Sequence, residues 1–167
     1  MLKPAIKYRE QLENLWYDIW FEEKYKYWNC GAFYEAFKID EDTWNRHQFV
    51  STSNDEVIGL IQYNIDRQSN SVSSLEIINF TDNIVVFGRD LKQALTDIFE
   101  KYKFRKINFS VVIGNPIEKS YNKMIEKHGG RIVGVYKDDV KLMDGNYYDR
   151  KLYEIFADDY FNYRRLF

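Results

Sequence analysis

The sequence has one cysteine, Cys30, and no long apolar run among its 167 residues. A single cysteine cannot form an internal disulfide, so the chain suits a reducing compartment, and we interpret Cys30 as a packing residue rather than a catalytic thiol. Membrane-spanning helices need ~20 consecutive apolar residues. Secretory signals need an apolar core, which the first residues, Met1 to Pro4, do not begin. These absences predict a cytoplasmic protein without membrane contacts.

An excess of one charge is also lacking, because 24 Lys and Arg residues nearly balance 26 Asp and Glu residues. The net charge of -2 gives none of the basic surface that nucleic-acid binding needs. The two histidines, His47 and His128, are far apart in the sequence, so we expect no metal site. With 45% hydrophobic residues and neither repeat nor linker, residues 1–167 are expected to form a single domain.

Aromatic residues are abundant, at 18% of the chain, and many of them crowd the first 50 residues. Aromatic side chains bury large areas while keeping polar tips, so they suit both cores and ligand pockets. Two interpretations stay open for this segment. It packs the first helix onto a sheet, or it also forms one wall of a pocket for an acceptor substrate.

The pattern of apolar residues predicts alternating strands first and helices later. Helical spacing predicts a helix over 8–28 that ends at Cys30-Gly31, and alternation predicts antiparallel strands over 48–52, 57–63 and 72–80. The pattern then predicts a helix over 89–103 with Asp90 as its N-cap, a strand over 107–113 and a helix closed by Gly129. Strands over 132–142 and 151–156, joined at Met143 to Asn146, follow, and residues 158–167 form a short helix or a tail.

One strand pair carries most of the topological information. The helix between residues 72–80 and 107–113 is long enough to be a crossover connection. Strands joined in this way lie parallel and next to each other. We therefore predict an α+β fold in which these two segments form the adjacent parallel pair of a mixed, mainly antiparallel sheet.

Several short motifs occur at defined places in this order of elements. They are Gly88 before a helix, Gly114-Asn115-Pro116, the segment Glu126 to Gly134, and Asp144 to Lys151. Together with the meander, helix, strand, helix and hairpin, they resemble the GNAT superfamily of acetyl-coenzyme-A-dependent N-acetyltransferases over roughly residues 45–157. The resemblance implies an α/β/α sandwich with helices on both faces and a parallel strand pair that splays apart.

The resemblance also implies a binding site for acetyl-coenzyme A (acetyl-CoA). The splayed strand would pair its backbone with the pantetheine, and the start of the following helix would bind the pyrophosphate. The residues implied to bind the cofactor are Ile78, Phe80, Val86, Phe87, Gly88, Arg89, Asp90 and Asn115. Residues 84–90 depart from the glycine-rich family pattern, since Gly88 is their single glycine. The negative charge of Asp90 would repel phosphate, and the positive charges of Arg89 and Lys92 partly offset this repulsion.

Acetyl transfer to an amine needs a base for the amine and an acid for the departing thiolate. Tyr121, which follows Asn115 by less than two helical turns, is the candidate acid, with ordinary helix packing as the alternative. Glu76 on the expected central strand is the candidate base, with an outward-facing strand residue as the alternative. Tyr147 and Tyr148 either approach the acceptor or support the hairpin.

We therefore expect an N-acetyltransferase whose acceptor is a small-molecule or peptide amine. The sequence leaves two other functions open. One is a non-catalytic GNAT-fold binding or scaffold module, which the unusual phosphate segment favours. The other is an enzyme that uses a longer acyl chain. A homodimer is one alternative for the oligomeric state.

Overall fold

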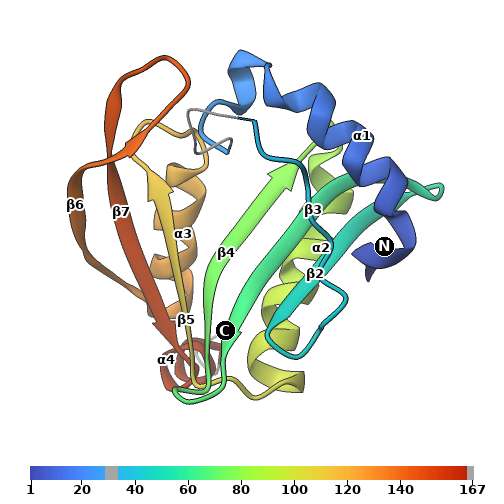
Figure 1. Cartoon of the computed structure of the whole chain (residues 1–167). Helices are drawn as coiled ribbons and strands as arrows, with labels where there is room; N and C mark the ends of the chain where they lie inside the picture. The colour runs from blue at the N-terminus through green and yellow to red at the C-terminus, as the bar shows by residue number, and fades with distance from the viewer. Residues whose placement is uncertain (29–33, 165–167) are drawn as a thin grey trace.

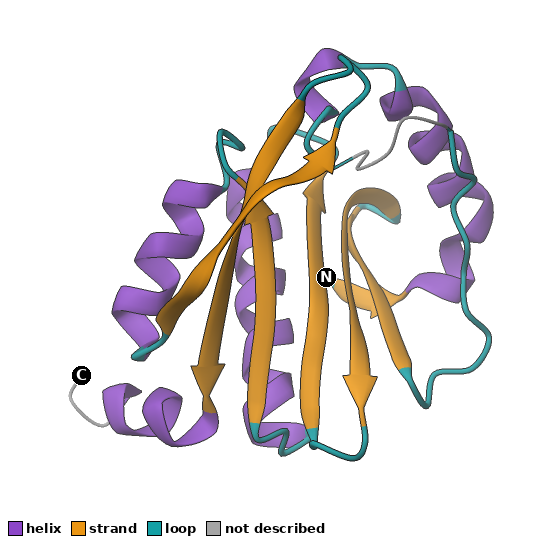
Figure 2. Ribbon diagram, turned by 60° about the vertical axis from the view of Figure 1, so that its left-hand side comes forward, coloured by secondary structure: helices purple, strands orange, loops and turns teal. Residues whose placement is uncertain are grey.

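The computed structural model describes residues 1–28 and 34–164. One mixed sheet carries helices on both of its faces (Figures 1 and 2). The strand order is β1-β2-β3-β4-β5-β7-β6. The strands are β1 (Leu2–Pro4), β2 (Arg46–Ser53), β3 (Glu56–Asp66), β4 (Ser71–Asn79), β5 (Lys106–Val112), β6 (Arg131–Lys141) and β7 (Tyr147–Phe156). The α-helices are α1 (Arg9–Trp20), α2 (Ile84–Thr96), α3 (Glu118–His128) and α4 (Ala157–Arg164); α2 runs on into a π-helical turn, η3 (Asp97–Lys101), and two short 3-10 helices are η1 (Ala5–Tyr8) and η2 (Glu23–Tyr25).

The predicted parallel pair is confirmed, and it splays. Within the described strands, pairing between β4 and β5 is confined to Ser71 with Lys106 and Val72 with Ile107. Beyond this point β4 has one residue more than β3, a bulge that contains Ser74 at φ +52°. A bulge bends and twists its strand. After it, β4 stays with β3 while β5 stays with β7, so a cleft opens between the two strands.

The two faces of the sheet have different cores. Helices α2, α3 and α4 pack on one face, around buried residues such as Ile61, Ile98 and Tyr153. Helix α1 packs on the other face, where Leu12, Val50 and others form a smaller cluster with the residues that follow the helix. The second face is only partly covered, because α1 lies toward the β1–β3 side (Figure 2). No helix of the described residues is long and apolar enough to cross a membrane.

The first helix is shorter than predicted. It ends at Trp20 instead of continuing to 28, because Glu22 has an extended backbone (φ -83°, ψ 126°) that breaks the helical hydrogen bonding. The aromatic residues Tyr25 to Trp28 leave the helix axis and reach the top of β4 instead. The predicted terminator, Cys30-Gly31, lies outside the described residues.

The second helix begins earlier than predicted. It starts at Ile84, and its N-cap is Asn83, whose Oδ1 accepts a hydrogen bond from the Val86 N–H at 3.3 Å. The predicted N-cap, Asp90, therefore lies inside the helix, almost two turns from its start. The error arose because β-branched residues fill the first turn, and such residues are more typical of strands than of helices.

Phe87 points into the core, where it packs against Gly59 of β3. A Cβ atom on Gly59 would lie 2.3 Å from the Phe87 ring and 2.8 Å from the Ile78 carbonyl oxygen. We expect Gly59→Ala to lower the free energy of unfolding by about 1–3 kcal/mol, because the ring and the backbone must move apart. Urea denaturation measures this. Gly134→Ala is the matched control, since a Cβ on Gly134 meets nothing within 4 Å, and equal stability of the two variants would contradict the packing.

Candidate active site

Along β4, the backbone N–H and carbonyl groups that face the cleft come from every second residue. The Phe80 N–H donates to the Ile58 carbonyl of β3 at 2.9 Å. Hydrogen-bonding groups alternate sides along an antiparallel strand, so Ile78 also bonds to β3, while Ile77 and Asn79 face β5. The backbone groups of Ile78 and Phe80 are thus directed at β3, and their implied contacts with the cofactor stay predictions. If pantetheine binds this edge, the backbone groups of Ile77 and Asn79 are those it can reach.

Aromatic residues from the N-terminal segment already occupy this edge. The Trp28 indole N–H donates to the Ile77 carbonyl at 2.7 Å, and the Tyr25 hydroxyl lies 3.5 Å from the Asn79 carbonyl oxygen. Buried or partly buried carbonyls need such partners. The segment Tyr25 to Trp28 thus closes the top of the cleft, and a ligand that bonds to the same carbonyls has to replace these contacts.

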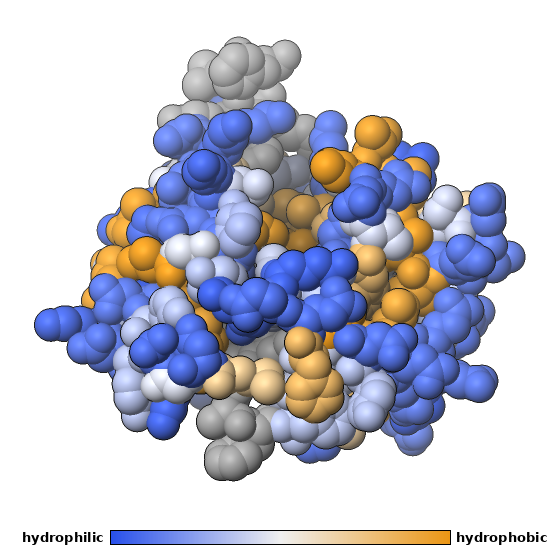
Figure 3. All heavy atoms as spheres, turned by 90° about the horizontal axis from the view of Figure 1, so that it is seen from above, coloured by the Kyte–Doolittle hydropathy of each residue, from blue (hydrophilic) through white to orange (hydrophobic). Residues whose placement is uncertain are grey.

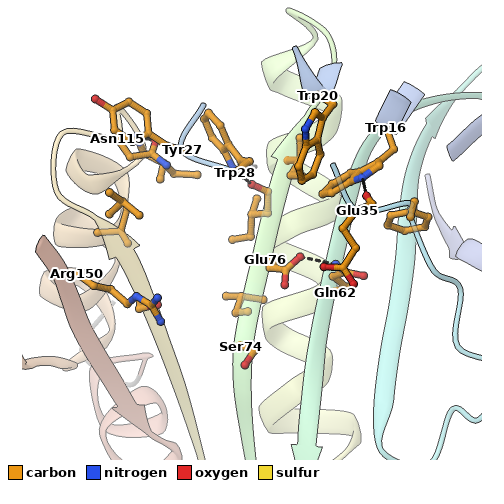
Figure 4. Close-up of a pocket in the computed structure, with 18 of the residues that line it drawn as sticks. Trp16, Trp20, Tyr27, Trp28, Glu35, Gln62, Ser74, Glu76, Asn115 and Arg150 are labelled. Atoms are coloured by element: carbon orange, nitrogen blue, oxygen red, sulfur yellow. Dashed lines mark hydrogen bonds between the residues drawn. The ribbon is translucent and has the colours of Figure 1, made fainter. Parts of the chain in front are cut away.

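A cavity of about 450 Å³ lies below this segment and continues into the cleft (Figure 4). Aromatic side chains from the N-terminal segment form one wall, and polar side chains of β3, β4 and β7 form much of the rest. Its lining includes Trp16, Trp20, Tyr27, Trp28, Phe37, Gln62, Ser74, Glu76, Asn115, Tyr121 and Arg150. Seen from above, this end of the molecule shows apolar residues interspersed with hydrophilic ones (Figure 3). The aromatic N-terminal segment therefore has both roles that the sequence left open, core packing and a pocket wall.

Glu76 projects into this cavity, and a chain of amides fixes its carboxylate. Gln62 Nε2 donates to Glu76 Oε2, and Gln48 Nε2 donates to Gln62 Oε1 at 2.8 Å. Gln48 is itself oriented, since its Nε2 donates to the Lys38 carbonyl at 2.9 Å and its Oε1 accepts from the Asp40 N–H at 2.8 Å. Each amide can satisfy these contacts in one orientation only. The two glutamine amides thus direct an N–H donor at Glu76 and hold the Glu76 carboxylate in the cavity, where it can accept a hydrogen bond or a proton.

Tyr121 lies in the same cavity, on the first turns of α3. It is 5% exposed, and its ring packs edge-on against Phe109 and Tyr153 at centroid distances of 5.0 and 6.0 Å. Burial raises the pKa of Tyr121 well above its usual value, and the negative charge of Glu76 raises it further. The hydroxyl therefore stays protonated near neutral pH. The structure brings the predicted acid and the predicted base to one cavity.

Asn115 forms the turn between β5 and α3. Its Oδ1 accepts the Ile117 N–H at 3.0 Å, which leaves Nδ2 as the donor that it can offer to a ligand. Gly114 has φ +99°, a conformation that favours glycine, and the Tyr27 hydroxyl lies 3.0 Å from where its Cβ would be. Asn115 is 6% exposed and lines the cavity, so its predicted contact with the cofactor remains a prediction with suitable geometry.

The start of α2 has fewer free amides than the phosphate prediction needs. The Ile84 N–H already donates to the Asp82 carbonyl at 2.8 Å, and the Val86 N–H donates to Asn83 Oδ1. Ile84 and Val85 are 75% and 84% exposed, so the first turn presents aliphatic side chains to solvent. Free N–H groups at a helix start are what binds an anion there. Any phosphate contact at this place must depend more on cationic side chains.

The residues predicted to surround the phosphates are divided between core and surface. The Phe87 N–H donates to the Asn83 carbonyl at 3.2 Å, so it is not free for a ligand. Asp90 is buried, and its Oδ2 accepts from Ser51 Oγ at 2.7 Å. Both residues hold α2 against the sheet in this structure, and their implied contacts with the cofactor stay predictions. Arg89 and Lys92 are exposed, so their predicted contacts with phosphate stay predictions.

Gly88 lies in the second turn of α2 with open space around it, since a Cβ there would meet nothing within 4 Å. We expect Gly88→Ala to raise the free energy of unfolding by about 0.5–1 kcal/mol, because glycine loses more backbone entropy in a helix. Urea denaturation measures this, with Gly129→Ala at φ +72° as the control that should destabilise the protein. We also expect unchanged affinity for CoA; a large loss of affinity on Gly88→Ala would show a close backbone contact at this position.

The two hairpin tyrosines lie outside the cavity lining. The Tyr148 hydroxyl donates to Asp144 Oδ2 at 2.5 Å, across the turn between β6 and β7, and its ring contacts that of Tyr27. Tyr147 is 60% exposed. Hairpin support is therefore the role that the contacts of Tyr148 show. Among the described residues no group of three or more His, Cys, Asp or Glu side chains could hold a metal ion.

The sequence pattern did not identify Gln62 or Arg46 as residues of the site, and it included Trp28 only within the aromatic segment that was one candidate pocket wall. Gln62 carries a usable signal, because it is a lone amide in the apolar run Val57 to Tyr63 and is 3% exposed. A buried polar residue in such a run needs a partner, and here the partner is the candidate base. Trp28 and Arg46 carry no comparable local signal, since their contacts depend on tertiary structure.

We compared the sequence and the structure with known proteins. No protein-family model matches the sequence, and a search of curated proteins gave no match. Among solved structures, spermidine N-acetyltransferase from Vibrio cholerae, in complex with CoA and spermine, superposes with a TM-score of 0.69 at 22% identity, over 97% of this chain and 98% of that one. A probable acetyltransferase (GNAT family) from Chromobacterium violaceum gives 0.68 at 12% identity, over 95% of this chain and 87% of that one.

A third structure, of a probable acetyltransferase, is matched over only 64% of its length and 70% of this chain, with a TM-score of 0.58 at 17% identity. The two longer matches cover the sheet, the cleft and the helices together. The α/β/α sandwich with a splayed parallel pair, which the family resemblance implied, is thus confirmed. The chain has the fold of the GNAT acetyltransferases.

Proposed function

We propose that this protein transfers an acetyl group from acetyl-CoA to a primary amine by direct attack. The observation that carries the proposal is the single cavity in which Glu76, Tyr121 and the open part of the β4–β5 cleft meet. The similar structures support the class of reaction, since one of them is a spermidine N-acetyltransferase in complex with CoA and spermine. The acceptor is a small-molecule or peptide amine.

The residues along the cleft fit acetyl-CoA better at its thiol end than at its phosphate end. The carbonyls of Ile77 and Asn79 suit the amide donors of pantetheine, and Asn115 Nδ2 suits a carbonyl. At the phosphate end the exposed cations Arg89 and Lys92 have to replace the free amides that α2 lacks. When bound, acetyl-CoA supplies an activated acyl group and a thiolate leaving group.

The protein side chains have three tasks in this reaction. Glu76, held by Gln62, accepts a proton from the acceptor ammonium, directly or through water. Tyr121, kept protonated by its burial, donates the proton that the departing sulfur requires. The aromatic wall of Trp16, Trp20 and Trp28 limits the access of water to the reacting groups.

A second function, a non-catalytic binding module, is favoured by one specific observation. Exposed Ile84 and Val85 stand where the fold otherwise offers free amides, and Trp28 bonds to the cleft edge. A chain that no longer bound the cofactor could keep both features. This alternative predicts that acetyl-CoA neither stabilises the protein nor reacts in its presence.

The proposal is tested by incubating the protein with acetyl-CoA and a panel of amines, amino acids and short peptides. We expect thiol release that depends on an acceptor, and an acetylated product in mass spectrometry. Protein without acceptor is the control for simple thioester hydrolysis. Thermal stabilisation by acetyl-CoA without transfer to any acceptor would favour the binding module, and the absence of both would contradict the proposal.

A further inference from the structure

Five acidic or basic side chains line the cavity: Glu35, Lys38, Arg46, Glu76 and Arg150. Three of them already have an oppositely charged partner. Lys38 Nζ lies 3.2 Å from Glu35 Oε1, and Arg150 Nε lies 2.8 Å from Asp139 Oδ2. The two remaining charges are the carboxylate of Glu76 and the guanidinium of Arg46. They have opposite signs, and both line the same cavity.

Arg46 is the more unusual of the two. Its Nε is buried and has no hydrogen-bond partner, and within residues 1–28 and 34–164 its guanidinium forms no ion pair. A buried donor on a charged group that lacks a partner destabilises the folded protein. Neighbouring Arg67 differs, because its guanidinium stacks on the Trp44 ring at 4.2 Å and bonds to the Trp44 carbonyl. Among the described residues, Arg46 is therefore a cation in the cavity lining that forms no ion pair and whose Nε lacks a hydrogen-bond partner.

The strand register places Arg46 and Glu76 on one face of the sheet. Gln48, Gln62 and Glu76 form a row across β2, β3 and β4. Arg46 precedes Gln48 by two residues, so it points to the same face, one row along. Strand and residue spacings put the Cα atoms of Arg46 and Glu76 ~12 Å apart. Both side chains are long enough to reach into the space between them, where a ligand can contact both.

We propose that the acceptor is a zwitterion, a primary amine that also carries a carboxylate, with its ammonium group at Glu76 and its carboxylate at Arg46. This inference rests on the proposed function and specifies its substrate class. A carboxylate matches the planar guanidinium in a bidentate contact. A simple amine would leave Arg46 unpaired, and the second cation of a diamine would meet its positive charge. The aromatic wall suits the hydrocarbon part of such a molecule.

The test measures binding to the purified protein, without cofactor, of three ligands that share the amine and differ at the other end. They are 4-aminobutanoate, 1-aminobutane and 1,4-diaminobutane, titrated by calorimetry at one pH and ionic strength. We expect wild-type protein to bind 4-aminobutanoate ~10–100-fold more tightly than 1-aminobutane, as expected for one charge-assisted contact. Arg46→Gln should remove this preference, and Arg46→Glu should shift it to the diamine. Arg67→Gln, the matched control, should keep the wild-type preference.

Each contrary result overturns the inference in a recognisable way. Equal affinity of the wild type for 4-aminobutanoate and 1-aminobutane, or no binding of any of the three ligands, contradicts it without any variant that must fold. Retention of the preference in Arg46→Gln contradicts the role of Arg46. Transfer assays separate this inference from the proposed function. Equal acetylation of all three amines leaves acetyl transfer intact and overturns the zwitterion, whereas preferential binding without transfer supports the zwitterion site and contradicts the enzyme.

Discussion

Replacing Tyr121 with phenylalanine is expected to lower kcat by about 10²–10⁴-fold, the usual contribution of a positioned proton donor. The substitution keeps the ring contacts with Phe109 and Tyr153 and removes only the hydroxyl. Because burial and the charge of Glu76 raise the pKa of Tyr121, the wild-type acid stays protonated across pH 7–9. The loss should therefore be similar throughout this range. Steady-state thiol release at saturating acceptor measures it.

Tyr153→Phe is the matched control for this experiment. Tyr153 is equally aromatic and buried, but its hydroxyl donates to Asn122 Oδ1 at 2.9 Å, away from the cavity lining. We expect this variant to lose some stability and to keep its kcat. Full kcat in Tyr121→Phe would assign the acid to another group, and a change confined to KM would indicate that Tyr121 only helps to bind the ligands.

Glu76→Gln is expected to lower kcat/KM by about 10²–10⁴-fold, because an amide cannot accept the proton of the acceptor ammonium. The new side chain keeps an oxygen that can accept from Gln62, so the amide chain from Gln48 survives and the fold should be retained. Since the charge of Glu76 contributes to the raised pKa of Tyr121, its removal should also lower that pKa. Rates from pH 6 to 9 measure the first effect.

Glu56→Gln, at the exposed start of the neighbouring strand β3, controls for the loss of one negative charge. It should retain the wild-type rate and pH profile. A Glu76→Gln variant with an unchanged rate at neutral pH would show that the acceptor loses its proton to solvent or to another group. Glu76 would then be a binding residue at most.

The sheet was predictable because its signals are local. Alternating apolar residues in 57–63 and 72–80 identify strands, and the amphipathic segment before Ile107 identifies a crossover. Those patterns specify the antiparallel meander and the parallel pair, which the structure confirms. The splaying of the parallel pair was expected from the resemblance alone, since no local residue pattern indicates the bulge that contains Ser74.

The start of α2 was not predictable in the same way. Ile84, Val85 and Val86 have the composition of a strand, and the Asn83 cap becomes recognisable only when Phe87 is seen to fill the space that Gly59 leaves. Tertiary packing here overrides local preference. The phosphate-binding interpretation assigned Phe87 and Asp90 to the pyrophosphate site, and the structure shows that both side chains are buried.

The residues of the candidate site also fall into two groups, those that a local sequence pattern predicts and those that depend on tertiary structure. Tyr121, Glu76 and Asn115 each follow from their position on an expected element, and the structure brings all three to one cavity. Gln62 and Arg46 depend on the register of three strands, which the sequence specifies only after the strands are paired. Side chains that act across strands are thus the part of the site that a single sequence does not reveal.

Calorimetric titration of the protein with acetyl-CoA tests the central claim most directly, because every proposed step depends on binding in the β4–β5 cleft. We expect saturable heat with a Kd in the micromolar range, about -8 kcal/mol. Binding should occur although Trp28 and Tyr25 contact the cleft edge, since each net hydrogen bond to be replaced is worth only about 0.5–1.5 kcal/mol. No heat and no thermal stabilisation at millimolar acetyl-CoA would contradict the account.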